Sequence, residues 1–395
     1  MRYAIVIPDG AADEPHPDLG NRTAFETASL PCLHRLASEG RVGMAVTIPP
    51  GMKAASDIAN LSVLGYDPAT YYTGRAPLEA AARGIRLAPG EAVFRVNTVT
   101  IENGRMISYA AGHIETSEAC DIIAALDRDL GLPGIRLYAG ISYRHLAVMA
   151  DMANTIPERV GPHEIPGAAV AEYAAAGPGA DRILEVEEKA AVLLSAYESN
   201  RQRIARGLLP VTHLWLWGGG VMPTLPSFRE RFGFSGGLIS AVDLLKGIAV
   251  LIGLDAISVP GATGYYDTNY AGKGQAALAC LAANRFAAVH IEATDEAGHN
   301  GHAAEKVRAL ENIDRHILSP LAAEADRSGD LRILYMPDHP TPLRVRNHTA
   351  DPVPFVMWGA GIKSKGAPRF TEAEIAKRSG PAVPAADLLR RMIAE

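Results

Sequence analysis

Short apolar runs bounded by polar residues recur along the chain and predict alternating strands and helices. Near the N-terminus, residues 3–8 are predicted as a strand, residues 31–40 as a helix, residues 41–48 as a strand and residues 57–64 as a helix. The same rhythm returns after Gly236 and continues almost to the end of the sequence. Alternation of this kind favours an α/β fold with a mostly parallel central sheet flanked by helices.

The middle of the chain has a different character. Between about residues 80 and 232 it holds a long helical stretch at residues 182–206 and loops rich in glycine and proline. We therefore expect a discontinuous core domain of residues 1–79 and 233–395, interrupted by a smaller inserted α+β domain of residues 80–232. All of the candidate metal ligands described below fall in the core domain.

Composition narrows the class of protein. A chain of 395 residues is too long for one ordinary core, which agrees with two domains. The net charge of −6 argues against a nucleic-acid binder, so an anionic substrate has to be held by locally placed arginine and lysine. The most apolar stretch, residues 239–259, contains three charged residues and is expected to be a buried helix and strand rather than a membrane span. Three widely spaced cysteines indicate reduced thiols and a cytoplasmic protein.

Three acidic residues each follow an apolar run. Asp9 follows YAIVIP, Asp295 follows FAAVHIEAT, and Asp338 follows LRILYMP. The carboxyl ends of parallel strands meet at one edge of a sheet, where α/β proteins place their active sites. We therefore expect these three carboxylates to converge.

Histidines accompany the acids. His299 lies four residues after Asp295, on the same face if the segment is helical, and His339 directly follows Asp338. His348 stands before the next apolar run, VPFVMW, while His302 is balanced between a ligand and an ordinary residue. Clustered carboxylates and imidazoles predict a metal site, and mixed oxygen and nitrogen donors suit Mn²⁺ or Zn²⁺ better than Mg²⁺.

Ser56 precedes Asp57 and the apolar IANLSVLGY, so one interpretation is a helix N-cap. The alternative is a hydroxyl placed on a second metal ion, where it attacks phosphorus beside the amides of a helix N-terminus. No G-x-S-x-G motif surrounds it, which disfavours a triad serine. Cationic side chains should balance phosphoryl charge. The candidates are Arg75, Arg83, Arg144, Lys246 and Lys273.

No nucleotide-binding fingerprint is present. Gly272-Lys273-Gly274 resembles the end of a phosphate loop, but Asp267 stands where the first glycine belongs and Gly274 replaces the serine or threonine. We therefore expect no nucleotide cofactor.

The chain resembles the archaeal-type, cofactor-independent phosphoglycerate mutases of the alkaline phosphatase superfamily. The resemblance covers nearly the whole chain and is carried by AIVIPDGAAD, SDIANLSVLGYDP, YYTGRAPLEAA, SYRHL, ISAVDLLKGI, GATGYYDTNYAGK, TDEAGHNG, MPDHPTP and HTADPVPF. It implies an alkaline-phosphatase-like core and an inserted domain that closes over a small phosphoglycerate substrate. It also implies two divalent ions, Mn²⁺ first and Zn²⁺, Co²⁺ or Mg²⁺ as alternatives, with no need for 2,3-bisphosphoglycerate.

The resemblance also implies roles for individual residues. Ser56 takes the phosphoryl group of 3-phosphoglycerate and returns it to the 2-hydroxyl of the glycerate. Lys246 lies near this nucleophile, and Arg144, Lys273 and the inserted domain's His113 are expected to contact substrate. The ligands of the first ion are Asp295, His299 and His348, and those of the second are Asp9, Ser56, Asp338 and His339.

The chain departs from the expected family pattern at three places. Ala54-Ala55 precede Ser56 where Pro-Gly is expected, Pro340 replaces serine, and His113 replaces arginine. One alternative is therefore a metal-dependent phosphohydrolase or mutase of another small phosphate ester. A second is a metal-binding protein without catalysis, which a cysteine-free ligand set fits poorly. We expect neither nucleic acid nor membrane as a partner, and a homo-oligomer stays an open alternative.

Overall fold

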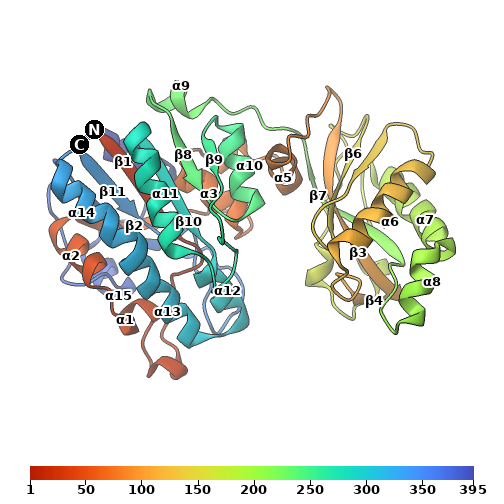
Figure 1. Cartoon of the computed structure of the whole chain (residues 1–395), viewed down its shortest axis with the longest axis horizontal. Helices are drawn as coiled ribbons and strands as arrows, with labels where there is room; N and C mark the ends of the chain where they lie inside the picture. Colours follow the sequence, from red (N-terminus) through yellow and green to blue (C-terminus); the bar gives the residue numbers. More distant parts are fainter. The chain divides into compact units, whose positions relative to one another are not determined.

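The computed structural model describes the whole chain, Met1–Glu395, as two compact units (Figure 1). Unit 1 contains Met1–Tyr72 and Thr224–Glu395, and unit 2 contains Thr73–Pro223. Both divisions fall a few residues before the boundaries expected from composition. Helix α5 (Arg75–Ala82), which the expected boundary cuts, therefore belongs entirely to unit 2.

An eight-stranded sheet with the order β13-β2-β12-β11-β1-β10-β8-β9 forms the centre of unit 1. β1 pairs in parallel with both β10 and β11, and β10, β8 and β9 continue in parallel, whereas β12 runs antiparallel to β11 and β2. The expected α/β fold with a mostly parallel sheet is confirmed. The strands are β1 (Arg2–Pro8), β2 (Arg41–Val46), β8 (Gly236–Ile239), β9 (Asp255–Ile257), β10 (Phe286–Ile291), β11 (Leu331–Tyr335), β12 (Val353–Gly359) and β13 (Val383–Pro384).

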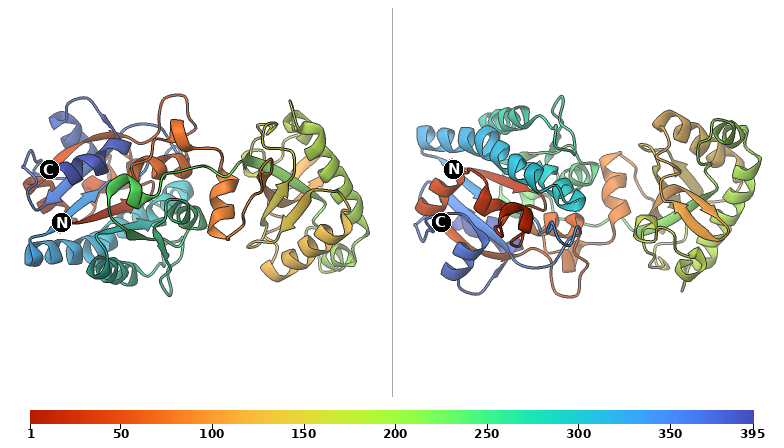
Figure 2. Two further views of the ribbon diagram at one scale, coloured as in Figure 1. Left: turned by 90° about the horizontal axis from the view of Figure 1, so that it is seen from above. Right: turned by 90° about the horizontal axis from the view of Figure 1, so that it is seen from below.

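Helices cover both sides of this sheet, as Figure 2 shows. The central strand β1 explains why they must, because Ala4 and Val6 on one face and Ile5 and Ile7 on the other are all 0% exposed. A strand buried on both faces reads as a continuous apolar run, which is how it stood out in the sequence.

The helices of unit 1 include the two expected near the N-terminus, α2 and α3, each within one residue of its predicted bounds. The expected helix and strand within residues 239–259 are α10 and β9. The α-helices of unit 1 are α1 (Ala24–Thr27), α2 (Pro31–Glu39), α3 (Ser56–Val63), α4 (Pro68–Tyr71), α9 (Phe228–Phe232), α10 (Asp243–Leu251), α11 (Tyr270–Ala283), α12 (Ala293–Asn300), α13 (Ala303–Ile313), α14 (Ser319–Ser328), α15 (Glu372–Arg378) and α16 (Leu388–Ala394). Short 3₁₀ turns are η1 (Pro17–Leu19) and η5 (Ala385–Asp387), and η4 (Asp314–Leu318) is a π-helical turn.

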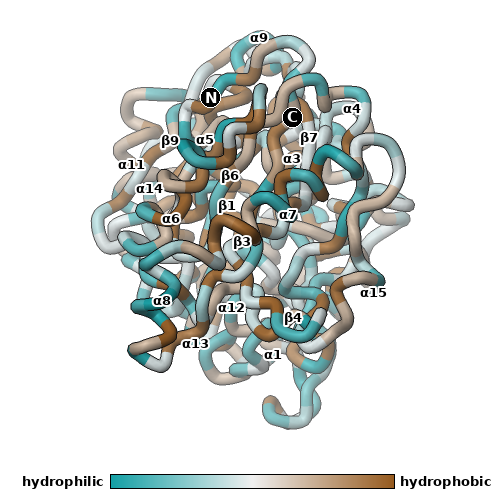
Figure 3. The backbone as a smooth tube through the Cα atoms, turned by 90° about the vertical axis from the view of Figure 1, so that its right-hand side faces the viewer, coloured by the Kyte–Doolittle hydropathy of each residue, from teal (hydrophilic) through white to brown (hydrophobic).

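Unit 2 has an antiparallel five-stranded sheet in which β3 pairs with β4, β6 and β7, and β5 pairs with β6. The helical stretch expected at residues 182–206 is broken at Tyr197, whose backbone is extended, so that two helices form, α7 and α8. Figure 3 shows a hydrophobic stretch in β3 and hydrophilic loops elsewhere in the chain. The elements of unit 2 are α5, β3 (Ala92–Glu102), β4 (Arg105–Ser108), α6 (Thr116–Asp129), β5 (Ile135–Tyr138), β6 (Arg144–Met149), η2 (Pro162–Glu164), η3 (Val170–Tyr173), α7 (Ala180–Ala196), α8 (Glu198–Ala205) and β7 (His213–Gly220).

None of the helices in either unit combines the length and the apolar character that crossing a lipid bilayer requires.

A buried ion pair fixes the loop after β1 to helix α13. The side chains of Lys306 and Asp13 are both 0% exposed, and Lys306 Nζ lies 2.7 Å from Asp13 Oδ2. The same ammonium donates to the carbonyl oxygen of Thr341 at 2.8 Å. Removing one member of a buried pair leaves the other charge without a partner in a dry environment.

We predict that Lys306→Met lowers the free energy of unfolding by about 3–5 kcal/mol. Arg308→Met on the same helix is the control, because Arg308 and Glu305 form an exposed pair, and its loss should cost less than about 1 kcal/mol. Urea titrations followed by circular dichroism compare the two variants, and equal effects would contradict the prediction.

Candidate metal centre

The expected acidic residues converge at one edge of the sheet of unit 1. β1 lies between β10 and β11 and runs parallel to both, so the carboxyl ends of the three strands are neighbours (Figure 1). Asp9 directly follows β1, Asp295 lies in the first turn of α12 after β10, and Asp338 follows β11. The carboxylates of Asp9 and Asp338 are fully buried, and Asp295 is 4% exposed.

One group of ligands forms around Asp295, as the sequence predicts. His299 is one turn further along α12, and its Nε2 lies 3.2 Å from Asp295 Oδ2. The Nε2 of His348 lies 3.4 Å from Asp295 Oδ1 and 2.9 Å from the Nε2 of His299. The nitrogens of two rings and the oxygens of one carboxylate therefore face a common point.

The Nδ1 atom of His299, which faces away from Asp295, has a backbone partner that orients the ring. Nδ1 lies 3.0 Å from the carbonyl oxygen of Arg346, which can only accept, so Nδ1 carries the proton and donates it. A cation bound in this group would replace the proton that Nε2 shares with Asp295, and it would be held by the Nε2 lone pair. This arrangement is typical of a metal-bound histidine, whose second nitrogen is held by a backbone carbonyl.

A second group forms around the Nε2 of His339. This atom lies 3.1 Å from Ser56 Oγ, 3.4 Å from Asp9 Oδ1 and 3.5 Å from Asp338 Oδ2. Asp9 Oδ1 is buried and has no hydrogen-bond partner. An orphaned carboxylate oxygen beside an imidazole nitrogen fits a site for a cation, because a buried polar atom otherwise costs free energy.

Ser56 is not the N-cap of α3, and that part of the sequence interpretation is wrong. Ala55 occupies the cap position with φ −162° and ψ 148°, and Ser56 is the first helical residue. Its hydroxyl, released from capping, faces His339. Ala55 is in extended backbone, so the alanine found where glycine was expected causes no strain at this turn.

The carboxylates of the site crowd one another. Burial, together with the carboxylates of Asp338 and Glu292, raises the pKa of Asp9 well above its ordinary value. Burial and the charge of Asp295 raise the pKa of Glu292 to about 8. Burial also acts to raise the pKa of Asp295, but hydrogen bonds from His299 and His348 outweigh it and hold that pKa well below its usual range. The donor sets and this excess of negative charge suit divalent metal ions.

The structure adds polar residues that the sequence analysis missed. Asn60 donates to Asp338 Oδ2 at 2.7 Å and to the Ser56 carbonyl at 2.9 Å. The Thr341 hydroxyl donates to Asp295 Oδ1 and lies 3.3 Å from His339 Nδ1, and the Thr294 hydroxyl donates to the Asp9 carbonyl. Asn60 could have been found, because it lies one helical turn after Ser56. The two threonines carry no such signal, because both hydroxyls act through long-range contacts.

His290 is a further residue that the analysis missed. It lies inside β10, is 0% exposed, and its Nε2 lies 2.8 Å from Asp9 Oδ2. Burial lowers the pKa of His290 to about 4, so the ring is neutral. A polar residue inside the apolar run FAAVHI is the feature of the sequence that marks it.

Other candidates in unit 1 have contacts with residues outside the two ligand groups. His302 Nδ1 is 3.1 Å from the Tyr266 hydroxyl, and His302 belongs to neither group. Lys246 is 3.3 Å from Asp243 on α10, a helix that packs against α3. Lys273 is 1% exposed and donates to the His290 carbonyl at 3.1 Å, which gives no support to a contact with substrate. Burial lowers its pKa to about 8.

Arg144 and His113 both lie in unit 2, within one aromatic cluster. The guanidinium of Arg144 is 5.3 Å from the ring centre of Tyr143, and the ring of His113 is 6.1 Å from the same ring. The Arg75 side chain is paired with Glu79 at 3.3 Å, and Arg83 donates to the carbonyl of Ala139. Substrate contacts by these residues stay a prediction.

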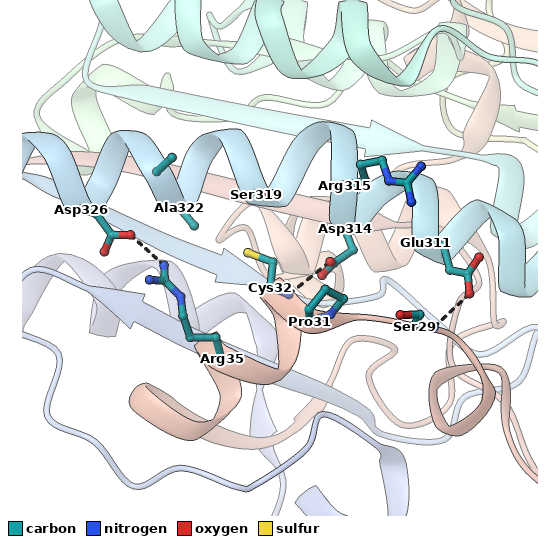
Figure 4. A pocket seen from close by; sticks show the side chains of 11 residues that line it. Ser29, Pro31, Cys32, Arg35, Glu311, Asp314, Arg315, Ser319, Ala322 and Asp326 are labelled. Carbon is teal, nitrogen blue, oxygen red and sulfur yellow. Dashed lines mark hydrogen bonds and ion pairs between the residues drawn. The ribbon is translucent and has the colours of Figure 1, made fainter.

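A cavity of about 530 Å³ lies elsewhere in unit 1, beside α2, η4 and α14 (Figure 4). Several of its polar groups are paired, since Asp314 accepts from the backbone amides of Cys32 at 3.2 Å and Leu33 at 2.7 Å, and Arg35 is paired with Asp326 at 2.9 Å. Burial and the Asp314 carboxylate raise the pKa of Cys32 to about 12, so its thiol is no nucleophile at neutral pH. The chemistry belongs to the strand ends instead.

Gly10 gives a test of how tightly the centre is packed. Its φ is +59°, and a Cβ atom there would overlap Asp295 Oδ1 and Thr341 Oγ1. Gly20 has a similar φ of +66° but no atom within 4 Å of the same position. Gly10→Ala should therefore weaken Mn²⁺ binding by at least about tenfold, because it displaces a ligand. Gly20→Ala should cost only the backbone strain, about 1–2 kcal/mol of stability. Isothermal titration with Mn²⁺ and thermal melts measure both, and unchanged Mn²⁺ affinity in Gly10→Ala would contradict the prediction.

Comparison with known proteins gives the family. A family model described as 2,3-bisphosphoglycerate-independent phosphoglycerate mutase matches residues 37–200. A Methanosarcina acetivorans protein of that name is 43% identical over 395 residues, covering 100% of both chains.

Two solved structures share the fold along the chain. A Pyrococcus horikoshii protein is similar with a TM-score of 0.83 and 28% identity, covering 100% of this chain and 96% of that one. A cofactor-independent phosphoglycerate mutase from Thermoplasma acidophilum is similar with a TM-score of 0.69 and 27% identity, covering 100% of this chain and 99% of that one. The two ligand groups, the serine beside them and 43% identity to a relative along the whole chain agree, and this protein belongs to the family of 2,3-bisphosphoglycerate-independent phosphoglycerate mutases.

Proposed function

We propose that this protein interconverts 3-phosphoglycerate and 2-phosphoglycerate through a phosphoserine on Ser56, at a centre that holds two divalent cations. The observation that carries the proposal is the position of the Ser56 hydroxyl. It lies 3.1 Å from His339 Nε2 and at the N-terminus of α3, where the partial positive charge of the helix favours a phosphoryl group. The identity of the substrate is inferred from membership of the family.

Each of the two ligand groups is assigned to one cation. Asp295, His299 and His348 are proposed to hold one. The other is assigned to Asp9, Ser56, Asp338 and His339, which converge on His339 Nε2. Mixed carboxylate and imidazole donors favour Mn²⁺, with Zn²⁺ and Co²⁺ as alternatives and Mg²⁺ less suited. When bound, such cations lower the pKa of a coordinated hydroxyl and neutralise charge on phosphoryl oxygens.

The chain's own residues define the steps. Ser56 Oγ loses its proton and bonds to phosphorus, while the bond between phosphorus and the 3-oxygen of the substrate breaks. That oxygen takes up a proton, which balances the one lost by Ser56. After the glycerate reorients, its 2-hydroxyl attacks the phosphoserine, and Ser56 Oγ recovers a proton as it leaves. Asn60 donates to the Ser56 carbonyl and to Asp338, and so fixes the position of the proposed nucleophile relative to this carboxylate.

A phosphohydrolase of another small ester was the alternative left open by the sequence. It needs the same cations and the same serine, so the ligand groups do not distinguish the two reactions. Identity along the whole chain to named mutases favours isomerisation. The difference lies in whether glycerate or water accepts the phosphoryl group from Ser56.

We expect Ser56→Ala to lower the rate of 3-phosphoglycerate isomerisation by at least about 10³-fold, because no other hydroxyl can replace a covalent nucleophile. Ser62→Ala is the matched control, since Ser62 is buried in the same helix and takes no part in the site. A coupled assay for 2-phosphoglycerate measures both, alongside release of inorganic phosphate. Free phosphate as the main product would favour the hydrolase, and full activity of Ser56→Ala would rule out the phosphoserine.

Removal of metal should stop turnover while leaving most of the fold in place. We expect dialysis against EDTA to abolish isomerisation and Mn²⁺ to restore it without any 2,3-bisphosphoglycerate, because the crowded carboxylates need cations for catalysis. Far-ultraviolet circular dichroism of the stripped protein should keep its helical signal. Loss of that signal, with no activity under any divalent ion, would instead favour a purely structural metal site.

A further inference from the structure

His290 lies behind the proposed metal ligand Asp9, and both of its ring nitrogens have partners. Nε2 lies 2.8 Å from Asp9 Oδ2, and Nδ1 lies 3.3 Å from Ser240 Oγ. The histidine and Asp9 are 0% exposed and Ser240 is 2% exposed, so water does not compete for these contacts. None of the roles proposed so far uses His290 or Ser240.

The partners determine which nitrogen carries the proton. Ser240 Oγ accepts from the backbone amide of Val242 at 3.0 Å, and its hydroxyl hydrogen is free to donate to His290 Nδ1 at 3.3 Å when Nε2 carries the ring proton. Nδ1 is then the acceptor, and the single N–H of the neutral ring is on Nε2, where it donates to Asp9 Oδ2. As a metal ligand Asp9 is ionised and can only accept, so both contacts agree on one tautomer.

The hydrogen bond from His290 makes the two carboxylate oxygens of Asp9 unequal. Oδ2 is taken by the histidine, while Oδ1 has no hydrogen-bond partner and lies 3.4 Å from His339 Nε2. The backbone of Asp9 is held as well, through its amide to the Ile291 carbonyl at 3.0 Å and its carbonyl to the Thr294 hydroxyl. Asp9 therefore presents one oxygen, in one orientation, to the metal centre.

Asp9, His290 and Glu292 also form a group close enough to hold a third cation. The neighbouring charges favour a different interpretation. The Nε2 of His290 is used by its hydrogen bond to Asp9, and the charge of Glu292 partly offsets the effect by which burial lowers the pKa of Lys273. The Lys273 ammonium donates to the His290 carbonyl at 3.1 Å, which ties it to the strand that carries the histidine.

We propose that His290 is a positioning residue that fixes Asp9 as a single-oxygen metal ligand, and that Ser240 sets the tautomer which makes this possible. The inference rests on the proposed function, because it assigns Asp9 to a cation. Lys273, expected from the sequence to contact substrate, is on this account part of the support behind the centre. Partners in this position typically change metal affinity by about 10–100-fold when they are lost.

The test compares Mn²⁺ binding by wild type, His290→Leu, His290→Gln and Ser240→Ala, using isothermal titration and the electron paramagnetic resonance signal of free Mn²⁺. His290→Leu removes the donor and should weaken the binding of one Mn²⁺ by about 10–100-fold. His290→Gln, whose amide can donate toward Asp9, should recover most of that loss. Ser240→Ala removes the partner of His290 Nδ1 that favours this tautomer, and it should weaken the binding of the same Mn²⁺ by a smaller factor.

His145→Leu is the matched control. His145 is a buried histidine of unit 2 whose Nδ1 accepts from the Gly140 amide at 3.0 Å, and its loss should leave Mn²⁺ affinity unchanged. Thermal melts separate a change of affinity from a loss of folding, and if His290→Leu does not fold, His290→Gln and Ser240→Ala decide the question. Wild-type affinity in all folded His290 and Ser240 variants would overturn the positioning role. A third Mn²⁺ bound by wild type and lost in His290→Leu would overturn it in favour of a metal ligand. No Mn²⁺ bound by wild type would overturn the proposed function itself.

Discussion

Four carboxylates meet at one buried edge of a parallel sheet, and unit 1 is arranged around the negative charge that results. Asp9, Glu292, Asp295 and Asp338 come from three neighbouring strands, and mutual repulsion and burial raise the pKa of Asp9 and Glu292. Burying carboxylates without partners is costly, and in proteins it is tolerated where cations compensate. The geometry makes sense as a metal centre and makes little sense as a purely structural core.

Neutral hydrogen bonds keep the acids in place without cancelling their charge. The amides of Gly10 and His339 donate to Asp338 Oδ1 at 3.0 and 2.9 Å, and Asn60 donates to its other oxygen. The Thr341 hydroxyl does the same for Asp295. A donor that carries no net charge orients a ligand but leaves it anionic, which a cation site requires. The absence of a side chain at Gly10 lets two of these groups approach closely.

The position of Ser56, the proposed nucleophile, depends on the same arrangement of strands. Ser56 begins α3, and Asn60, one turn later, ties that helix to the acid after β11. Covalent phosphoryl transfer needs the hydroxyl, the ligands and the helix N-terminus in one place, since positioning and electrostatics supply most of the catalysis in such reactions. Here the chain brings them together from segments that are more than two hundred residues apart in the sequence.

The sequence by itself determined the strands, the acids that follow them and the α/β class, because apolar runs and the residues that end them are local properties. It also located His299 and His348, whose Nε2 atoms face the Asp295 carboxylate, and the family to which the chain belongs. Only the tertiary structure decided where the Ser56 hydroxyl points, since capping and a contact with His339 are both compatible with the local sequence.

The same holds for residues whose partners are distant in the chain. His290 reads locally as one polar residue in a strand, and Lys273 reads as a candidate phosphate ligand. Folding instead places His290 against Asp9 and buries Lys273 behind it. The reason is physical: the role of a buried polar group is set by the donors, acceptors and charges around it, and these are assembled only when the strands align.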